Sequence, residues 1–546
     1  MSHTAVIRLR LCIVAAALLI GIAATAQSQG KLYPIAGVLT NSATGEPVAG
    51  ATMSLYGGPP QNREFLQSVQ TDGEGRFALP LVPAGKYSLR AMRRGYLAEE
   101  FNEHEGFSSA IVTGEGQDTA HIPFHLDPGA VVRGVVTDDA GEPVENANVL
   151  LVRRSNSDGL GERLRTVASG MTDDTGLFEF WGLNPGTYFL AVKAEPWFAV
   201  HPPLRALNAA DEEDRAAMAV LDVAYPVTYY DGATEESAAA PISVKSGERV
   251  QADVALHSVP ALHLTVPTSG QQPGSIVGMR QTVLGNDGFA GGNGVTRPLR
   301  GANEMEFDGV APGHYTLMEG NPPREMEFDA TGSQQVNPSS GVPTFDVTIH
   351  ARMADGSQLP QGLAMVLSSG DTTQTHQWHV DARGETQLKG VEPGEWNLSA
   401  TGGTGMLGVV SIQAGAAAPR AESRIAVRDR DLTLNIVLAA GKTNVEGFAA
   451  KDGHNEAGVM LVLVPKNPAG HVAEFRRDQS DSDGSFSLLN VVPGEYTVVA
   501  LEDGWDLDWA KPEEIGRYLK DGAPVTVPMN APAVMKLGSP VVVQRK

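Results

Sequence analysis

The sequence predicts an all-β protein, built as a tandem array of about five β-sandwich domains. One short phrase recurs five times: a hydrophobic strand runs into Pro, then Gly, then an aromatic residue that opens the next strand. The aromatic residues are Tyr87, Tyr188, Tyr315, Trp396 and Tyr496. Successive prolines of the phrase are 102, 127, 81 and 100 positions apart, and each interval is about as long as one small β-sandwich.

Length and composition agree with several domains rather than one. A chain of 546 residues exceeds the size of a single compact core. The 61 glycines and 35 prolines are spread along the chain, as an array of short strands and tight turns requires. The repeats place sandwich one at 32–126, sandwich two at 127–258, a divergent sandwich three at 259–341, sandwich four at 342–438 and sandwich five at 439–546.

Residues 1–26 resemble an export signal. Arg8 and Arg10 precede an apolar run that is short for a membrane span, and small residues follow at the expected cleavage positions. The alternative is a retained membrane anchor. The one cysteine, Cys12, lies in this segment, so the mature chain would carry no disulfide. We expect a periplasmic, cell-surface or secreted protein with no membrane span in the mature chain.

The negative net charge of the chain limits the classes of partner that it can bind. Removal of Arg8 and Arg10 leaves 39 basic and 64 acidic residues, which argues against nucleic acid and against an anionic membrane surface. The sequence says nothing of the oligomeric state.

Each repeat opens with a turn and a strand. In sandwich one the stretch 45–51 (Gly-Glu-Pro-Val-Ala-Gly-Ala) leads into a strand at 52–56, and 141–147 repeats it closely in sandwich two. An Asp-containing turn that ends in Gly follows, and then a strand whose apolar residues alternate. These pairs are Phe77 and Leu79, Phe178 and Phe180, and Phe486 and Leu488. Period-two spacing places each pair on one face, toward a core.

The Pro-Gly-x-aromatic phrase predicts a structural corner. Pro restricts φ and Gly allows the chain to turn. The aromatic ring can then pack inward while its hydroxyl reaches the backbone, as in a tyrosine corner. Trp396 keeps the ring and offers an N–H donor instead of the hydroxyl.

Sandwich two carries an insertion at 205–224, rich in Ala, Leu, Asp and Glu. The acidic run 211–214 suits a helix N-terminus, where carboxylates meet the positive end of the dipole. We expect one short surface helix here. The Gly-rich stretch 290–294 in sandwich three predicts a loop.

Together, the Gly-Glu-Pro-Val opening, the Asp-Gly-x-Phe turn and the Leu-x-Pro-Gly-x-Tyr corner resemble the carboxypeptidase regulatory-like domain family. Sandwiches one, two and five match its motifs well, sandwich four in part, and sandwich three mainly at its corner. The resemblance implies transthyretin-like (prealbumin-like) β-sandwiches of about seven strands, grouped with starch-binding-like and other carbohydrate-binding-like folds. It also implies a non-catalytic module, named for its place beside metallopeptidases.

The residues themselves predict neither enzyme activity nor a bound metal or cofactor. His471 and Glu474 form the one His-x-x-Glu pair, and no histidine follows to complete a zinc site. His376 and His379 lie three apart, which on a strand places them on opposite faces. The segment 481–484 (Asp-Ser-Asp-Gly) is better explained as a hairpin turn than as a calcium loop.

Aromatic residues suggest the ligand, because sugar rings stack on Trp and Tyr. Trp505 and Trp509 lie four apart, with Asp503 and Asp506 placed to accept hydroxyl protons. A second group flanks the insertion. It consists of Trp197, Tyr229 and Tyr230. The alternative is that these rings pack onto their own sandwiches. Trp181 and Trp396 are assigned to cores.

We therefore expect a non-catalytic exported scaffold that binds a glycan or another surface component of the bacterial envelope. One alternative is a structural or adhesive module that binds an envelope protein, for example through exposed sheet edges. The other is an accessory or regulatory subunit of a peptidase.

Overall fold

The structure is a computed structural model of the 546-residue chain. It describes residues 31–59, 62–155, 163–267, 276–285, 296–298, 304–320, 323–337, 343–369, 375–402 and 406–546. The export segment expected at 1–26 and the Gly-rich stretch 290–294 lie outside these residues. No helix in the described part is long and apolar enough to cross a membrane.

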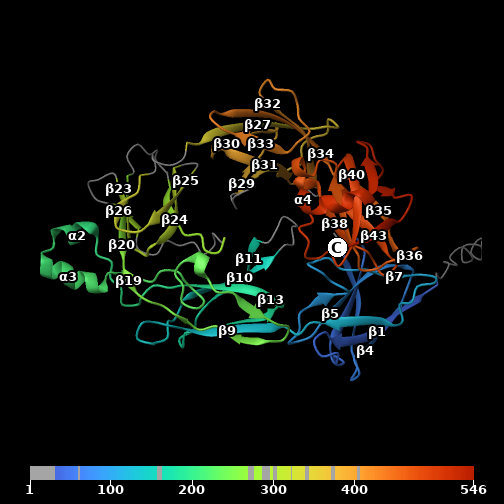
Figure 1. The fold of residues 1–546 in the computed structure, drawn as a ribbon, viewed down its shortest axis with the longest axis horizontal. Coiled ribbons are helices and arrows are strands. Elements are labelled where there is room, and N and C mark those ends of the chain that lie inside the picture. The colour runs from blue at the N-terminus through green and yellow to red at the C-terminus, as the bar shows by residue number, and fades with distance from the viewer. Residues whose placement is uncertain are drawn as a thin grey trace, which may run out of the picture.

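The described chain is all-β and forms five sandwiches in tandem, as predicted. Their core residues span 35–126, 130–256, 262–336, 347–438 and 445–541. The sandwiches follow an arc, and the last one returns to lie beside the first, near the point marked C (Figure 1). This return distinguishes the molecule from a simple row of domains.

Sandwich one contains two sheets, in strand orders β4-β1-β8 and β3-β2-β5-β6, with β7 also paired to β5. Its strands are β1 Tyr33–Asn41, β2 Thr52–Gly57, β3 Glu64–Gln70, β4 Arg76–Val82, β5 Gly85–Met92, β6 Glu99–Glu100, β7 Ile111–Thr113 and β8 Ile122–Leu126. The first and last strands pair in parallel. A Cβ on Gly37 of β1 would lie 2.0 Å from the carbonyl oxygen of Ile122, so this close approach of backbones requires glycine.

Sandwich two repeats this plan, with sheets β12-β9-β17 and β11-β10-β13-β15. Its strands are β9 Ala130–Thr137, β10 Asn148–Ser155, β11 Arg163–Met171, β12 Leu177–Leu183, β13 Gly186–Lys193, β15 Thr228–Tyr229, β16 Ile242–Val244, β17 Arg249–Gln251 and β18 Val254–Ala255, with a 3₁₀ turn η1 at Glu236–Ala238. The strand pair β14 Val223–Ala224 and β19 Val259–Pro260 closes the insertion.

The insertion forms two helices rather than the one expected, α2 Leu204–Ala209 and α3 Glu212–Leu221. The predicted acidic start is confirmed, because the Asp211 side chain accepts a hydrogen bond from the Asp214 N–H at 2.9 Å. Neither helix has a fully buried residue. Both lie at the outer side of the arc, against sandwich three (Figure 1).

Sandwich three has sheets β22-β23-β20-β26 and β21-β24-β25. Its strands are β20 Leu262–Pro267, β21 Ile276–Arg280, β22 Thr296–Pro298, β23 Glu304–Val310, β24 Gly313–Gly320, β25 Pro323–Ala330 and β26 Gln334–Gln335. In β20 and β23 the residues of one face, including Leu264 and Phe307, form the core. The residues of the other face, including Glu306, face the insertion.

In sandwich four, β32 pairs with both β31 and β34, which joins the strands into one eight-stranded sheet. The strands are β27 Phe345–Met353, β28 Ala364–Ser369, β29 Thr375–His379, β30 Glu385–Val391, β31 Gly394–Thr401, β32 Leu407–Ala414, β33 Arg424–Val427 and β34 Leu432–Ala440. Sandwich four thus departs in topology from the two-sheet plan of the first copies, and so does sandwich five, whose strands form one nine-stranded sheet.

Sandwich five is built on β35, β40 and β37. Its elements are β35 Thr443–Lys451, β36 His454–Asn455, β37 Met460–Pro465, η4 Pro468–Gly470, η5 Val472–Glu474, β38 Arg476–Gln479, β39 Ser485–Val491, β40 Gly494–Glu502, α4 Pro512–Ile515, η6 Gly516–Asp521, β41 Ala523–Val527, β42 Val534–Lys536 and β43 Val541–Arg545.

All five predicted corners are present, and they share one hydrogen bond. Each aromatic side chain donates to the carbonyl oxygen four residues back. The donor–acceptor distances are 3.1 Å for Tyr87, 2.6 Å for Tyr188, 2.8 Å for Tyr315, 3.1 Å for Trp396 and 2.8 Å for Tyr496. A Cβ on Gly494 would lie 3.1 Å from the Tyr496 ring, so the glycine of the phrase leaves room for the ring to fold back.

Removal of a corner should destabilise its own sandwich. We expect Tyr188→Ala to lower the free energy of unfolding of sandwich two by about 3 kcal/mol or more, from the lost buried ring and its hydrogen bond. Tyr188→Phe should cost about 1 kcal/mol, because only the donor to Asn184 is lost. Calorimetry of the full chain measures both changes. An equal loss of unfolding free energy in every calorimetric transition would contradict the view that each sandwich has its own core.

Candidate functional site

The predicted glycan residue Trp505 lies at a contact between the two ends of the array. We call this contact the clasp. It joins loop 101–113 of sandwich one to residues 476–485 and Trp505 of sandwich five. The His104 ring stacks on the Trp505 ring, with centroids 4.4 Å apart and planes at 7°. The Arg477 guanidinium lies over the rings of Phe107 and Trp505, at 4.3 and 5.3 Å. Trp505 is thus engaged within the protein.

Hydrogen bonds continue the clasp along the backbone. The Ser109 hydroxyl donates to the Ser480 carbonyl at 2.8 Å. The Ser482 N–H donates to the Ala110 carbonyl at 3.0 Å, and the Val112 N–H donates to the Ser482 hydroxyl at 2.8 Å. The side chain of Gln479 is fully buried and donates to Ser109 Oγ and to the Asn102 carbonyl. The clasp is therefore a packed interface with several hydrogen bonds between sandwiches one and five.

One residue of the clasp has changed its role within the repeat. In sandwiches one, two and four, the first Asp of the Gly-ending turn accepts hydrogen bonds from its own turn. These residues are Asp72, Asp173 and Asp381. In sandwich five the equivalent Asp481 reaches sandwich one instead: it accepts from the Ala110 N–H at 2.8 Å and pairs with Lys86 at 2.6 Å. The predicted hairpin turn is confirmed, with Gly484 at φ 79°.

The other residues of the first predicted glycan group do not form a platform with Trp505. Trp509 is only 7% exposed and packs with Phe475 in a small core on the outside of β37 and β40. Asp503 is exposed, and Asp506 pairs with Lys546. The two tryptophans therefore do not offer paired surface rings to a sugar chain, and this favours the alternative in which they cover their own sandwich.

The second predicted group also divides between core and surface. Tyr229 is buried in an apolar joint between sandwiches two and three, and Tyr230 is half-buried against the core of sandwich two. Trp197 is 85% exposed and meets Phe198 edge to face, with centroids 5.8 Å apart. Of this group, Trp197 alone presents a ring to solvent.

Trp197 belongs to a wider exposed surface on the insertion. The Val200 N–H donates to the Leu221 carbonyl at 2.8 Å, which brings the segment after Trp197 against the end of α3. Val200, Val220 and Leu221 are all exposed. We call Trp197, Phe198, Val200, Val220 and Leu221 the insertion patch. Exposed aromatic and aliphatic side chains gathered in this way are typical of a binding surface.

The assignment of Trp181 to a core is wrong, whereas that of Trp396 is confirmed. Trp181 is 78% exposed, because it lies on the outer face of β12, opposite the face that carries Phe180. Trp396 is buried at its corner.

Sandwich one has a shallow pocket of about 580 Å³ over its sheet β4-β1-β8. Apolar side chains line it, with Arg76 and His121 among the polar ones. Arg76 pairs with Glu74, and His121 pairs with Asp118. Because these polar groups engage their neighbours on the exposed surface, the pocket offers few converging contacts for a ligand.

The residues that resembled metal ligands have structural roles. His471 donates from Nδ1 to the Glu474 carboxylate at 3.0 Å and from Nε2 to the Ala421 carbonyl at 2.7 Å, at the junction of sandwiches four and five. The hydrogen bond to Glu474 is the main cause that raises the pKa of His471. His376 contacts the rings of Trp378 and Trp396, while His379 is exposed, as expected from opposite faces of β29.

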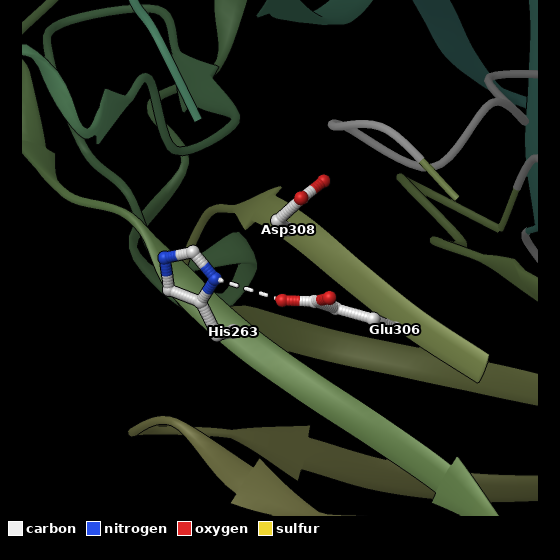
Figure 2. Close-up of side chains that lie close together, drawn as sticks. All are labelled: His263, Glu306 and Asp308. Atoms are coloured by element: carbon white, nitrogen blue, oxygen red, sulfur yellow. Dashed lines mark ion pairs between the residues drawn. The ribbon is translucent and has the colours of Figure 1, made fainter. Parts of the chain in front are cut away.

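A buried polar cluster lies where the insertion covers sandwich three (Figure 2). His263 comes from β20, and Glu306 and Asp308 come from the same face of β23. Glu306 and Asp308 are fully buried, and one ligand atom from each of the three side chains lies within 4.8 Å of the others. The sequence analysis missed this cluster. Its one signal was the Glu-x-Asp alternation in a strand, which normally marks a solvent-facing side.

The insertion completes the cluster. Asp222 ends α3 and accepts hydrogen bonds from His263 Nε2 at 2.7 Å and from His201 Nδ1 at 3.0 Å. Leu204 at the start of α2 donates its N–H to Glu306 Oε1. Burial acts to lower the pKa of His263, but the hydrogen bond to Asp222 and the nearby carboxylates outweigh it, so the pKa is raised.

Sequence comparison assigns part of the chain to a known family. Residues 34–126 and 131–197 match the carboxypeptidase regulatory-like domain, as the motifs predicted. No curated protein matches the chain.

Solved structures with some similarity include two pilins. The TIE protein of Bacillus anthracis aligns over 95% of this chain and 74% of its own, at 9% identity and a TM-score of 0.17. A streptococcal ancillary pilin aligns over 52% of this chain and 99% of its own, at 13% identity and 0.20. A minor pilin of Streptococcus agalactiae aligns over 42% and 97%, at 12% identity and 0.21. Such low scores carry no argument about function.

Disruption of the clasp should open the arc. Asp481→Ala leaves the half-buried Ala110 N–H without its acceptor, which costs about 1–3 kcal/mol and raises the open population about 5- to 150-fold. Energy transfer between dyes on sandwiches one and five should fall. The matched control is Asp381→Ala, which alters an equivalent turn outside the clasp. Unchanged transfer in Asp481→Ala would refute a clasp that depends on Asp481.

The junction of sandwiches four and five should weaken as pH rises. Because the folded-state pKa of His471 is raised above 6.5, its stabilising contribution is complete below that value and is lost as pH passes the folded-state pKa. The difference in unfolding free energy between the wild type and His471→Gln, measured at pH 5.5 and 8.5, should therefore shrink. A difference that stays constant over this range would contradict the assignment.

Proposed function

We propose that the protein is an exported binding scaffold whose ligand is a glycan of the bacterial envelope. The match of residues 34–126 and 131–197 to the carboxypeptidase regulatory-like domain, a non-catalytic fold, supports this proposal. The observation that carries the proposal is the insertion patch, with Trp197 85% exposed beside Phe198. A fully exposed indole has apolar surface that a sugar ring can cover, which recovers hydrophobic free energy.

The arc supports this function by limiting motion. The clasp ties sandwich five to sandwich one, and the joint that contains Tyr229 ties sandwich two to sandwich three. A binding surface held on such a frame loses less conformational entropy when it engages a ligand. Both contacts support a frame of this kind for the insertion patch.

A second candidate function is protein binding, favoured by the aliphatic half of the same patch. Val200, Val220 and Leu221 are exposed, and they suit the apolar centre of a protein interface better than a sugar. This is the adhesive alternative, in which the partner is an envelope protein.

Two variants test the glycan proposal. We expect Trp197→Ala to abolish retention on the glycans that the wild type binds in an array, with little change in melting temperature, because the ring is exposed. Trp181→Ala is the matched control: its ring is 78% exposed on another face of sandwich two, and retention should persist. Retention that survives Trp197→Ala would exclude this surface.

A third variant separates the two partners. Val220→Ser combined with Leu221→Ser removes aliphatic surface while Trp197 stays in place. If the glycan is the ligand, this variant should keep wild-type retention. If the wild type binds no glycan in the array, the glycan proposal is wrong and the protein partner is favoured.

A further inference from the structure

The cluster of His263, Glu306 and Asp308 has the composition of a cation site. The cluster and the two residues that extend it by hydrogen bonds contain two histidines and three carboxylates. These are His201 and His263, and Asp222, Glu306 and Asp308. Even with both imidazoles protonated, these five residues keep an excess of negative charge. Burial of a carboxylate destabilises the folded protein unless the carboxylate is paired with an opposite charge or binds a metal ion.

Two atoms of the cluster face inward without a hydrogen bond. Among the described residues, His263 Nδ1 and Glu306 Oε2 have no hydrogen-bond partner, although the His263 side chain is 4% exposed and Glu306 is fully buried. His263 Nδ1 lies 3.7 Å from Glu306 Oε1, too far for a hydrogen bond. Figure 2 shows the two side chains pointing toward each other, with Asp308 next to them on β23.

The hydrogen bond at the other ring nitrogen of His263 is also typical of a metal-binding histidine. Asp222 accepts from Nε2 at 2.7 Å, so that nitrogen carries a proton and Nδ1 is the nitrogen that binds a metal ion, which would displace any proton there. A histidine that binds a metal commonly donates its second ring N–H to a carboxylate, which sets the tautomer and the ring orientation. Asp222 is itself held by His201 at 3.0 Å.

We propose that His263, Glu306 and Asp308 of sandwich three bind a divalent transition-metal ion beneath the insertion of sandwich two. One imidazole nitrogen and two carboxylates suit zinc or manganese. Binding would draw the three ligand atoms, now up to 4.8 Å apart, to about 3.3 Å from one another, as expected for tetrahedral bonds of about 2.0 Å. The site does not depend on the glycan proposal.

The role of the ion is structural. The ligands come from sandwich three, whereas Asp222 and Leu204, which contact His263 and Glu306, come from the insertion. A metal at this point fixes the outer face of the sheet to the segment that covers it. Its binding free energy then adds to the stability of the folded arrangement.

The test is zinc binding by the full mature protein, without an affinity tag, after treatment with a chelator. We expect the wild type to take up one zinc ion and its melting temperature to rise. Glu306→Gln and Asp308→Asn should each weaken zinc binding at least about 10-fold. Asp329→Asn is the matched control, because Asp329 forms an exposed pair with His314 in the same sandwich. It should bind zinc as the wild type does.

Two results would overturn the site: no saturable zinc binding by the wild type, or equal binding by Glu306→Gln. X-ray absorption of the zinc-loaded wild type gives an answer even if a variant misfolds. One imidazole nitrogen with oxygen ligands supports the site, and a shell of several imidazoles contradicts it. When a chelator keeps the protein free of metal, the free energy of unfolding of Glu306→Gln should be at least as large as that of the wild type, because the substitution removes a buried charge.

Discussion

The hydrogen bond from an aromatic side chain to the carbonyl oxygen four residues back is the interaction on which each sandwich depends. It closes the turn between two core strands, and it satisfies the polar atom that a buried ring would otherwise leave unpaired. Burial raises the pKa of Tyr188 and Tyr496, so both hydroxyls stay protonated and donate. Trp396 makes the same bond through its indole N–H, which explains why the position tolerates Trp.

The repeats differ in the groups that the first Asp of each Gly-ending turn contacts. A turn needs its first Asp to accept backbone N–H groups, as Asp72 does in sandwich one. In sandwich five, Asp483 accepts from the Ser485 N–H, and Asp481 contacts sandwich one instead. Such a shift alters no core residue, so the same sandwich can become part of an interface through one or two polar side chains.

The insertion has a comparable effect on sandwich three. The outer face of an exposed sheet is normally polar, and Glu306 and Asp308 fit that rule in the sequence of β23. The covering segment removes them from water and places Asp222 opposite His263. Residues that the sequence pattern assigns to a surface thereby become buried charged groups that require hydrogen bonds or an opposite charge.

The sequence by itself determined the all-β class, the repeated corners, the glycine-ending turns and the acidic start of the helical insertion, because these depend on local backbone geometry and on the period-two pattern of each strand. The surroundings of Trp505, Trp509 and Trp181 were decided only by the tertiary structure. Exposure depends on which segment covers a face, and contacts such as His104 with Trp505 join residues far apart in the chain. The clasp and the buried cluster arise for that reason, since the clasp pairs groups from two sandwiches and the insertion of sandwich two covers the cluster of sandwich three.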